Sequence, residues 1–180
     1  MSTVKPKVLI VGAGLGGITL ALLLERAGVN YEVFERATVV KPLGSAISLG
    51  SNVLFMSKQL NLLDEIQRIG KPFPFTDICD ENRVVQNHVD VSFVEKLGGY
   101  HGYVVSRPRL NALLLRFIPP HKIHFQKRVL SKNQDADGVA ISTADNMKHS
   151  GDILVGADGA YSSVRQNMYK QLKLRGKLPK

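Results

Sequence analysis

Apolar positions near the amino terminus alternate between strand-like and helix-like spacing. Residues 7–11 (KVLIV) form a continuous apolar run that ends at Gly12, as expected of a strand buried on both faces of a parallel sheet. Apolar residues recur at helical spacing over residues 15–27, and Gly28 follows where a left-handed cap is needed. Residues 31–34 (YEVF) resume a strand pattern. The sequence therefore predicts a βαβ unit with a right-handed crossover.

The remaining pattern predicts an α/β fold with a Rossmann-like parallel sheet, a β-meander and an antiparallel excursion. The excursion spans residues 73–106, where β-like stretches at 84–91 and 103–106 show little helical periodicity. The meander follows from apolar alternation around Asp-Gly and Asp-Asn turns. The other predicted elements are helices at 51–59 (capped by Ser51), 62–68, 108–117 and from 163, and strands at 123–125, 129–132, 139–143, 147–150 and 152–155.

Composition excludes membrane-spanning and internally disulfide-bonded classes of protein. Of the 180 residues 44% are hydrophobic and 22% are charged, and no apolar run has the length of a membrane span. The single cysteine, Cys79, excludes an internal disulfide and is expected to be a small buried residue rather than a nucleophile. We expect a cytoplasmic protein in reducing conditions.

The net charge of +9 suggests nucleic-acid binding until its position is considered. Residues 160–180 carry six basic and no acidic side chains, which is two thirds of the excess. A basic end of this kind is usually solvated, so we expect no nucleic-acid partner. The histidines are dispersed, and no metal site is predicted.

The segment GAGLGG places Gly12, Gly14 and Gly17 at GxGxxG spacing between the first strand and the first helix. In a dinucleotide-binding unit the first glycine permits the turn, the second admits a pyrophosphate and the third allows helix and strand to pack. Glu35 closes the second strand, where a carboxylate can bind the hydroxyls of an adenosine ribose. The alternative for the glycines is a role in packing only, and the alternative for Glu35 is that it is a surface glutamate without a ligand. An acid at this place favours FAD or NAD over NADP.

A second pattern distinguishes between these cofactors. The run ADGAYSSVR, with Asp158, Gly159, Ser162 and Arg165, resembles the DGxxSxxR fingerprint of the class A flavoprotein monooxygenases, the p-hydroxybenzoate hydroxylase family. VSRPRLNALLL resembles the RxxL helix of that family, with Arg107 in the arginine position, and FERA resembles its acidic strand end. Within the family, the chain is most similar to the fungal salicylate-hydroxylase-like and epoxidase-like branch.

The resemblance implies FAD as cofactor and NAD(P)H as a transient reductant. It implies that Arg36 lies on the adenine side and that the backbone of Val129 meets adenine, while Arg107 reaches the phosphate or ribityl region. Asp158 and Arg165 belong to a motif that the family uses for FAD and, indirectly, for NAD(P)H. The alternative for Arg165 is a structural pairing with a nearby carboxylate. The implied cofactor-binding residues are Gly12, Gly14, Gly17, Glu35, Arg36, Arg107, Val129, Asp158 and Arg165, and no catalytic residue is assigned.

The chain departs from the family by lacking the later GDAAH-like motif, which holds the ribityl chain and part of the flavin ring. The resemblance therefore implies an amino-terminal half. On this interpretation residues 1–72 and 107–180 form a discontinuous FAD-binding domain without its carboxy-terminal part, and residues 73–106 form part of a substrate domain. We expect this chain alone to bind FAD weakly through its adenine half, to hydroxylate nothing, and to self-associate through an unfinished apolar face.

Three functions remain open at this point. The first is the FAD-binding portion of an NAD(P)H-dependent monooxygenase that hydroxylates or epoxidises an apolar or aromatic small molecule. The second is a non-catalytic dinucleotide-binding or assembly module. The third is an NAD-dependent dehydrogenase, which the DGxxSxxR motif disfavours.

Overall fold

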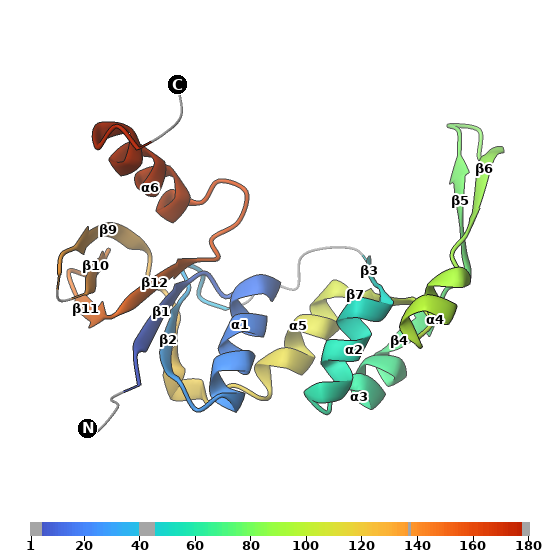
Figure 1. The fold of residues 1–180 in the computed structure, drawn as a ribbon, viewed down its shortest axis with the longest axis horizontal. Coiled ribbons are helices and arrows are strands. Elements are labelled where there is room, and N and C mark those ends of the chain that lie inside the picture. The colour runs from blue at the N-terminus through green and yellow to red at the C-terminus, as the bar shows by residue number, and fades with distance from the viewer. Residues whose placement is uncertain (1–4, 40–45, 137, 178–180) are drawn as a thin grey trace. The chain divides into compact units, whose positions relative to one another are not determined.

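A computed structural model describes residues 5–39, 46–136 and 138–177. The chain divides into two compact units. Unit 1 comprises Met1–Lys41 and Leu114–Lys180, and unit 2 comprises Pro42–Leu113. Figure 1 labels most of the helices and strands of both units.

A parallel sheet forms the centre of unit 1, with strands β1 (Lys7–Val11), β2 (Asn30–Phe34), β8 (Ile123–His124) and β12 (Ile153–Gly156) in the order β12-β1-β2-β8. The register pairs Ile10 of β1 with Val33 and Val155. Leu9 and Ile10 are fully buried, which explains the continuous apolar run, because a central parallel strand has no polar face. The predicted Rossmann-like sheet is confirmed.

Helix α1 (Leu15–Arg26) connects β1 to β2 and packs against both strands (Figure 1). Its buried residues, Gly17, Ile18, Ala21 and Leu22, recur at the spacing of one helix face. Ala27 is the C-cap of the helix, and Gly28 follows at φ +62°, in the left-handed conformation that glycine adopts without strain. The predicted βαβ unit is confirmed.

The predicted meander consists of β9 (Val129–Gln134), β10 (Val139–Thr143) and β11 (Lys148–Gly151), in the order β11-β10-β9. One hydrophobic cluster joins it to the parallel sheet. That cluster consists of Leu9, Phe34, Val139 and Ile141, with Val129 and Leu154 packed against it. The meander therefore covers a face of the sheet. The short η1 helix (Pro120–Lys122) precedes β8.

Helix α6 (Ser163–Leu174) follows β12 and carries much of the basic charge of the carboxyl-terminal segment. Ser162 caps it, because its Oγ accepts a hydrogen bond from the Arg165 N–H at 3.0 Å. Met168, Tyr169 and Leu174 are exposed on this helix. Within the described parts of the chain, no helix combines the length and apolar character that a bilayer crossing requires.

Unit 2 contains helices α2 (Ser51–Gln59), α3 (Leu63–Ile69) and the beginning of α5 (Arg107–Leu115) beside an antiparallel sheet of β3 (Ala46–Leu49), β7 (Tyr103–Ser106) and β4 (Gly70–Pro72). Leu54, Leu62, Ile66 and Val105 are almost completely buried in this unit. The three helices follow the predicted positions. The expected Ser51 cap is wrong, since Gly50 is the N-cap and Ser51 begins the helix.

A hairpin of β5 (Phe75–Cys79) and β6 (Val85–Asp90) extends from unit 2 with every residue exposed. It agrees with the predicted antiparallel character of this segment. Cys79 is exposed, so its expected burial is wrong, because the described residues do not cover this hairpin. Helix α4 (Phe93–Gly98) was also not predicted. It is too short to show periodicity, and Gly99 closes it at φ +75°.

Candidate functional site

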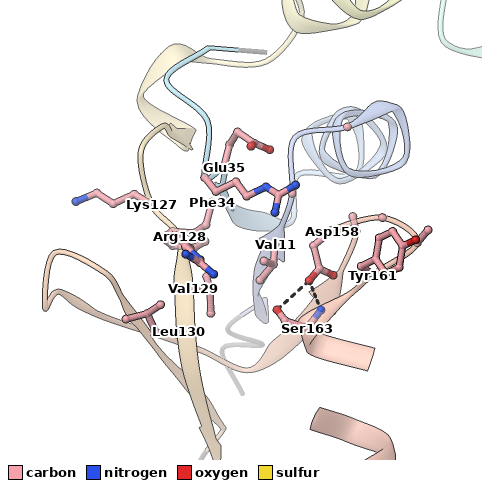
Figure 2. A pocket seen from close by; sticks show the side chains of 16 residues that line it. Val11, Phe34, Glu35, Lys127, Arg128, Val129, Leu130, Asp158, Tyr161 and Ser163 are labelled. Carbon is pink, nitrogen blue, oxygen red and sulfur yellow. Dashed lines mark hydrogen bonds between the residues drawn. The ribbon is translucent and has the colours of Figure 1, made fainter. Parts of the chain in front are cut away.

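A cleft of about 620 Å³ opens at the carboxyl ends of β1, β2 and β12, and residues 127–130 at the start of β9 complete its wall (Figure 2). Its lining residues all belong to unit 1. Open α/β sheets bind ligands outside the carboxyl ends of their strands. Six predicted cofactor-binding residues line the cleft, namely Gly12, Gly14, Glu35, Arg36, Val129 and Asp158.

Gly12 and Gly17 are required by the protein's own packing. Gly12 has φ +105°, and a Cβ there would lie 2.5 Å from the carbonyl oxygen of Ala157. A Cβ on Gly17 would lie 2.0 Å from the carbonyl oxygen of Gly12. These distances are far below van der Waals contact, so the loop between β1 and α1 can close only with glycine at both positions.

Gly14 differs from these two glycines. Its φ of −71° suits any residue, and a Cβ there would meet no described atom within 4 Å beyond its chain neighbours. It is the N-cap of α1, without a side-chain cap, and the first turn of α1 has no acidic residue. The first N–H groups of a helix lack acceptors within the helix and carry partial positive charge. The first turn of α1 therefore offers an open site for an anion, with no acidic residue of its own.

The Glu35 carboxylate lies beside this loop and is half-buried. Its two oxygens accept hydrogen bonds from the backbone N–H groups of Ala13 and Ala37, each at 2.8 Å. A carboxylate has about four lone-pair sites, so each oxygen keeps capacity for a hydroxyl donor. Glu35 can thus hold the glycine loop and accept from the hydroxyls of a ribose at the same time.

Asp158 lines the opposite side of the cleft and also caps α6. Its carboxylate accepts from the Ser163 N–H at 2.6 Å and from the Ser163 hydroxyl (Figure 2). The Ser162 hydroxyl also donates to this carboxylate. Partial burial alone would raise the pKa of Asp158, but hydrogen bonds from Ser162 and Ser163 outweigh burial and hold the pKa below its ordinary value of 3.8. This carboxylate therefore compensates the α6 N-terminus, whereas among the described residues the first turn of α1 has neither a side-chain cap nor an acidic residue.

The three predicted residues outside the cleft lining have different placements. Gly17 packs beneath the loop, as described above. The guanidinium of Arg165 donates to the carbonyl of Ala160 in the turn before α6, not to the carboxylate named in the alternative interpretation, and its role toward a cofactor stays a prediction. Arg107 begins α5 in unit 2, and its contact with a cofactor stays a prediction.

Sequence reasoning missed the residues just before Val129. Lys127 and Arg128 line the cleft, and the Lys127 N–H donates to the Glu35 carbonyl at 2.8 Å. The Lys127 side chain pairs with Asp145 in the turn between β10 and β11. The available signal was the pair of basic residues in QKRVL next to the predicted adenine contact. Tyr161, almost fully exposed, was likewise missed within the DGxxSxxR motif.

Comparison with known proteins shows which family this chain resembles. A family model described as FAD binding domain matches residues 5–178. The FAD-dependent monooxygenase pynG of Aspergillus niger is 31% identical over 176 residues, which cover 89% of this chain and 38% of that protein. The FAD-dependent urate hydroxylase of Klebsiella oxytoca is 35% identical over 162 residues, covering 88% of this chain and 42% of that protein.

The fold agrees with solved structures of such enzymes. The structure of Klebsiella pneumoniae HpxO complexed with FAD and uric acid matches with a TM-score of 0.77 and 29% identity, covering 88% of this chain and 40% of that one. The chain thus spans less than half the length of these relatives. With a cleft at the carboxyl ends of the strands and this match over nearly its whole length, the chain belongs to the FAD-binding domain family of the class A FAD-dependent monooxygenases.

Proposed function

We propose that this chain supplies the FAD-binding part of an NAD(P)H-dependent monooxygenase that hydroxylates or epoxidises an apolar or aromatic small molecule. The carrying observation is the uncapped N-terminus of α1, open at Gly14 and flanked by the Glu35 carboxylate. These groups fit a diphosphate joined to a ribose. When bound and reduced by NAD(P)H, FAD supplies the activation of oxygen that such a reaction requires.

The proposed cofactor contacts follow from the cleft. The amides at the start of α1 hold the diphosphate, with Gly14 leaving room for it, and Glu35 accepts from the ribose hydroxyls. Arg36 and the backbone of Val129 lie on the adenine side of the cleft. Asp158 and Arg165 act through the turn that they hold between β12 and α6. Arg107 would add a bidentate donor to a phosphate.

The proposed domain division assigns residues 1–72 and 107–180 to FAD binding and residues 73–106 to part of a substrate domain. The hairpin of β5 and β6 supports the second assignment, because Phe75, Ile78 and Val85 are about half exposed on it. A surface of this kind favours contact with further protein. We therefore propose that this chain self-associates. We also propose that this chain alone does not hydroxylate substrate and that it acts in the cytoplasm.

A second candidate is a non-catalytic dinucleotide-binding module. One observation favours it, since the lining of the cleft belongs to unit 1 alone. Such a module needs only the adenosine diphosphate half of its ligand. This half is common to FAD and ADP, whereas FMN lacks it.

Titration of the purified chain with FAD, FMN and ADP tests the proposal. We expect isothermal titration calorimetry to show that FAD binds, that ADP displaces it, and that FMN binds at least roughly tenfold more weakly, since the cleft recognises the diphosphate and ribose. Absence of FAD binding, or FMN binding as tight as FAD, would contradict it. Addition of NADH or NADPH to this chain together with the remaining part of the enzyme then separates the two candidates, because only a monooxygenase supports oxidation of the nicotinamide by bound FAD and this chain alone is proposed to be inactive.

A further inference from the structure

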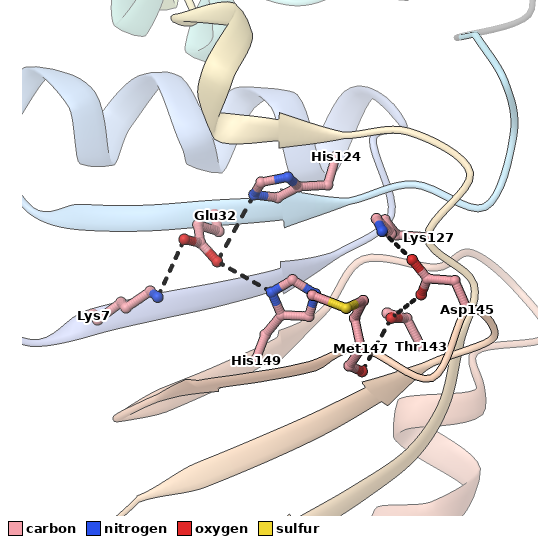
Figure 3. A network of polar contacts seen from close by, with 8 residues as sticks. All are labelled: Lys7, Glu32, His124, Lys127, Thr143, Asp145, Met147 and His149. Carbon is pink, nitrogen blue, oxygen red and sulfur yellow. Dashed lines mark hydrogen bonds and ion pairs between the residues drawn. The ribbon is translucent and has the colours of Figure 1, made fainter.

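A polar cluster lies between the parallel sheet and the meander, outside the lining of the cleft (Figure 3). Glu32 of β2 faces two imidazoles. Its Oε2 lies 3.8 Å from His124 Nε2 on β8 and 3.9 Å from His149 Nδ1 on β11. Lys7 of β1 pairs with the other carboxylate oxygen at 3.2 Å. The cluster therefore joins three strands of the sheet to one strand of the meander.

The hydrogen bonding of this cluster is incomplete. Glu32 Oε2, His124 Nε2 and His149 Nε2 are buried and have no hydrogen-bond partner among the described residues. A neutral imidazole carries a proton on one nitrogen, whereas a protonated one donates from both. If His149 is protonated, its Nδ1 can face Glu32, but its Nε2–H is left buried without an acceptor. Such an unpaired buried donor costs free energy.

The charges around His149 do not offset this cost. Burial is the largest influence and lowers the pKa of His149. Glu32 and Asp145 act in the opposite direction, while His124 and Lys127 add to the lowering. The pKa of His149 therefore lies below its ordinary value of 6.5.

The cluster is in contact with the cofactor cleft through Phe34. The Phe34 ring lies 5.1 Å from the ring of His124 and 4.6 Å from that of His149, measured between centroids. Phe34 also lines the cleft. The chain that enters the meander, including Lys127 and Val129, forms the neighbouring wall. Docking of the meander on the sheet thus keeps this wall in place.

We infer that the meander docks on the parallel sheet through a pH-sensitive contact in which His149 is neutral, so that acidification loosens the wall of the cofactor cleft. Its consequence for the cofactor rests on the proposed function. The direction of this pH effect follows from the linkage between proton binding and folding. A histidine whose pKa is lower in the folded state than in the unfolded state binds fewer protons when folded. The stability that it contributes is complete above its ordinary pKa and is lost as the pH falls from that value through the lowered folded pKa.

Hydrogen exchange of the backbone amides of β10 and β11 tests this inference without any cofactor. Protection factors, corrected for intrinsic exchange, are compared at about pH 7.5 and about pH 5.5 in the unmodified chain and in His149→Gln and His88→Gln variants. His88 is an exposed histidine of the β5–β6 hairpin in unit 2 and serves as the control. We expect protection to fall by more than about twofold, and by at most about tenfold, in the unmodified chain and in His88→Gln, and by less than about twofold in His149→Gln.

An unchanged protection factor in the unmodified chain, or an equal loss in His149→Gln, would overturn the inference. A second measurement needs no variant. Proton NMR titration of the His149 ring must give a pKa below the ordinary value, and a pKa at or above it would also overturn the inference. Failure of the chain to bind FAD would contradict the proposed function while leaving both of these readouts intact.

Discussion

The carboxylate of Glu35 accepts a hydrogen bond from the backbone N–H of Ala13 at 2.8 Å. This contact joins the end of β2 to the loop that follows β1. A second hydrogen bond from the Ala37 N–H, also at 2.8 Å, holds the other oxygen. The residue proposed to bind the ribose therefore also fixes the loop proposed to bind the phosphates, and the two functions of Glu35 are separable by measurement.

Replacement of Glu35 by glutamine should lower both stability and FAD affinity. The amide keeps one acceptor oxygen, so one of the two backbone donors loses its partner. We expect a loss of about 1 to 3 kcal/mol in the free energy of unfolding, measured with urea. FAD affinity should fall by about 1 to 2 kcal/mol, because charge-assisted hydrogen bonds to the ribose are lost. Glu81→Gln, at an exposed position in unit 2, is the control. If Glu35→Gln changed neither the free energy of unfolding nor the FAD affinity, both proposed functions of Glu35 would be refuted.

Alanine at Gly12 or Gly17 should destabilise the chain before any ligand is considered. The new Cβ would overlap the Ala157 carbonyl in the first case and the Gly12 carbonyl in the second. Alanine at position 12 would also be strained, because the backbone there has a positive φ. We expect losses of more than about 2 kcal/mol in each variant, by chemical denaturation. Stability within about 0.5 kcal/mol of the unmodified chain would show that the loop is packed differently.

The capping of α6 by Asp158 should depend on pH. Asp158→Asn removes the carboxylate that accepts from Ser163 and should cost about 1 kcal/mol near pH 6. The pKa of Asp158 is lowered in the folded state, so its contribution is complete above the ordinary value of 3.8 and is lost as the pH falls through the lowered folded pKa. The difference between the two proteins, measured by urea unfolding, should therefore shrink toward about pH 3. A difference independent of pH would contradict the role of the charge.

Much of unit 1 could be predicted from local sequence patterns. The apolar run of β1, the helical spacing of α1 and the turns of the meander each determine their own element. Helix α4 could not be predicted, because Phe93–Gly98 is too short for periodicity to show. The exposure of Cys79 also escaped prediction, since it depends on what other segments leave uncovered.

The site was predictable where a motif is contiguous and was missed where it depends on pairing between distant segments. Gly14 and Glu35 could be located because the strands that position them are adjacent in the sequence. Lys127 reaches the cleft through the hydrogen bond of its N–H to the Glu35 carbonyl, a contact that no local pattern encodes. The capping role of Asp158 was hidden for a different reason, since the motif resemblance pointed to the cofactor and not to α6.

The central claim is that the diphosphate of FAD occupies the open space at Gly14, and a pair of alanine variants tests it most directly. Gly14 and Gly16 both lie in open space, and neither has a positive φ. Gly16→Ala should leave stability unchanged or raise it by about 0.4 to 1 kcal/mol, whereas Gly14→Ala should lower it by up to about 1 kcal/mol, because Gly14 is the N-cap of α1 and alanine is a poor cap. FAD affinity, measured by isothermal titration calorimetry, should fall roughly tenfold or more in Gly14→Ala and stay within about twofold in Gly16→Ala. Equal FAD affinity in Gly14→Ala, Gly16→Ala and the unmodified chain would contradict the claim.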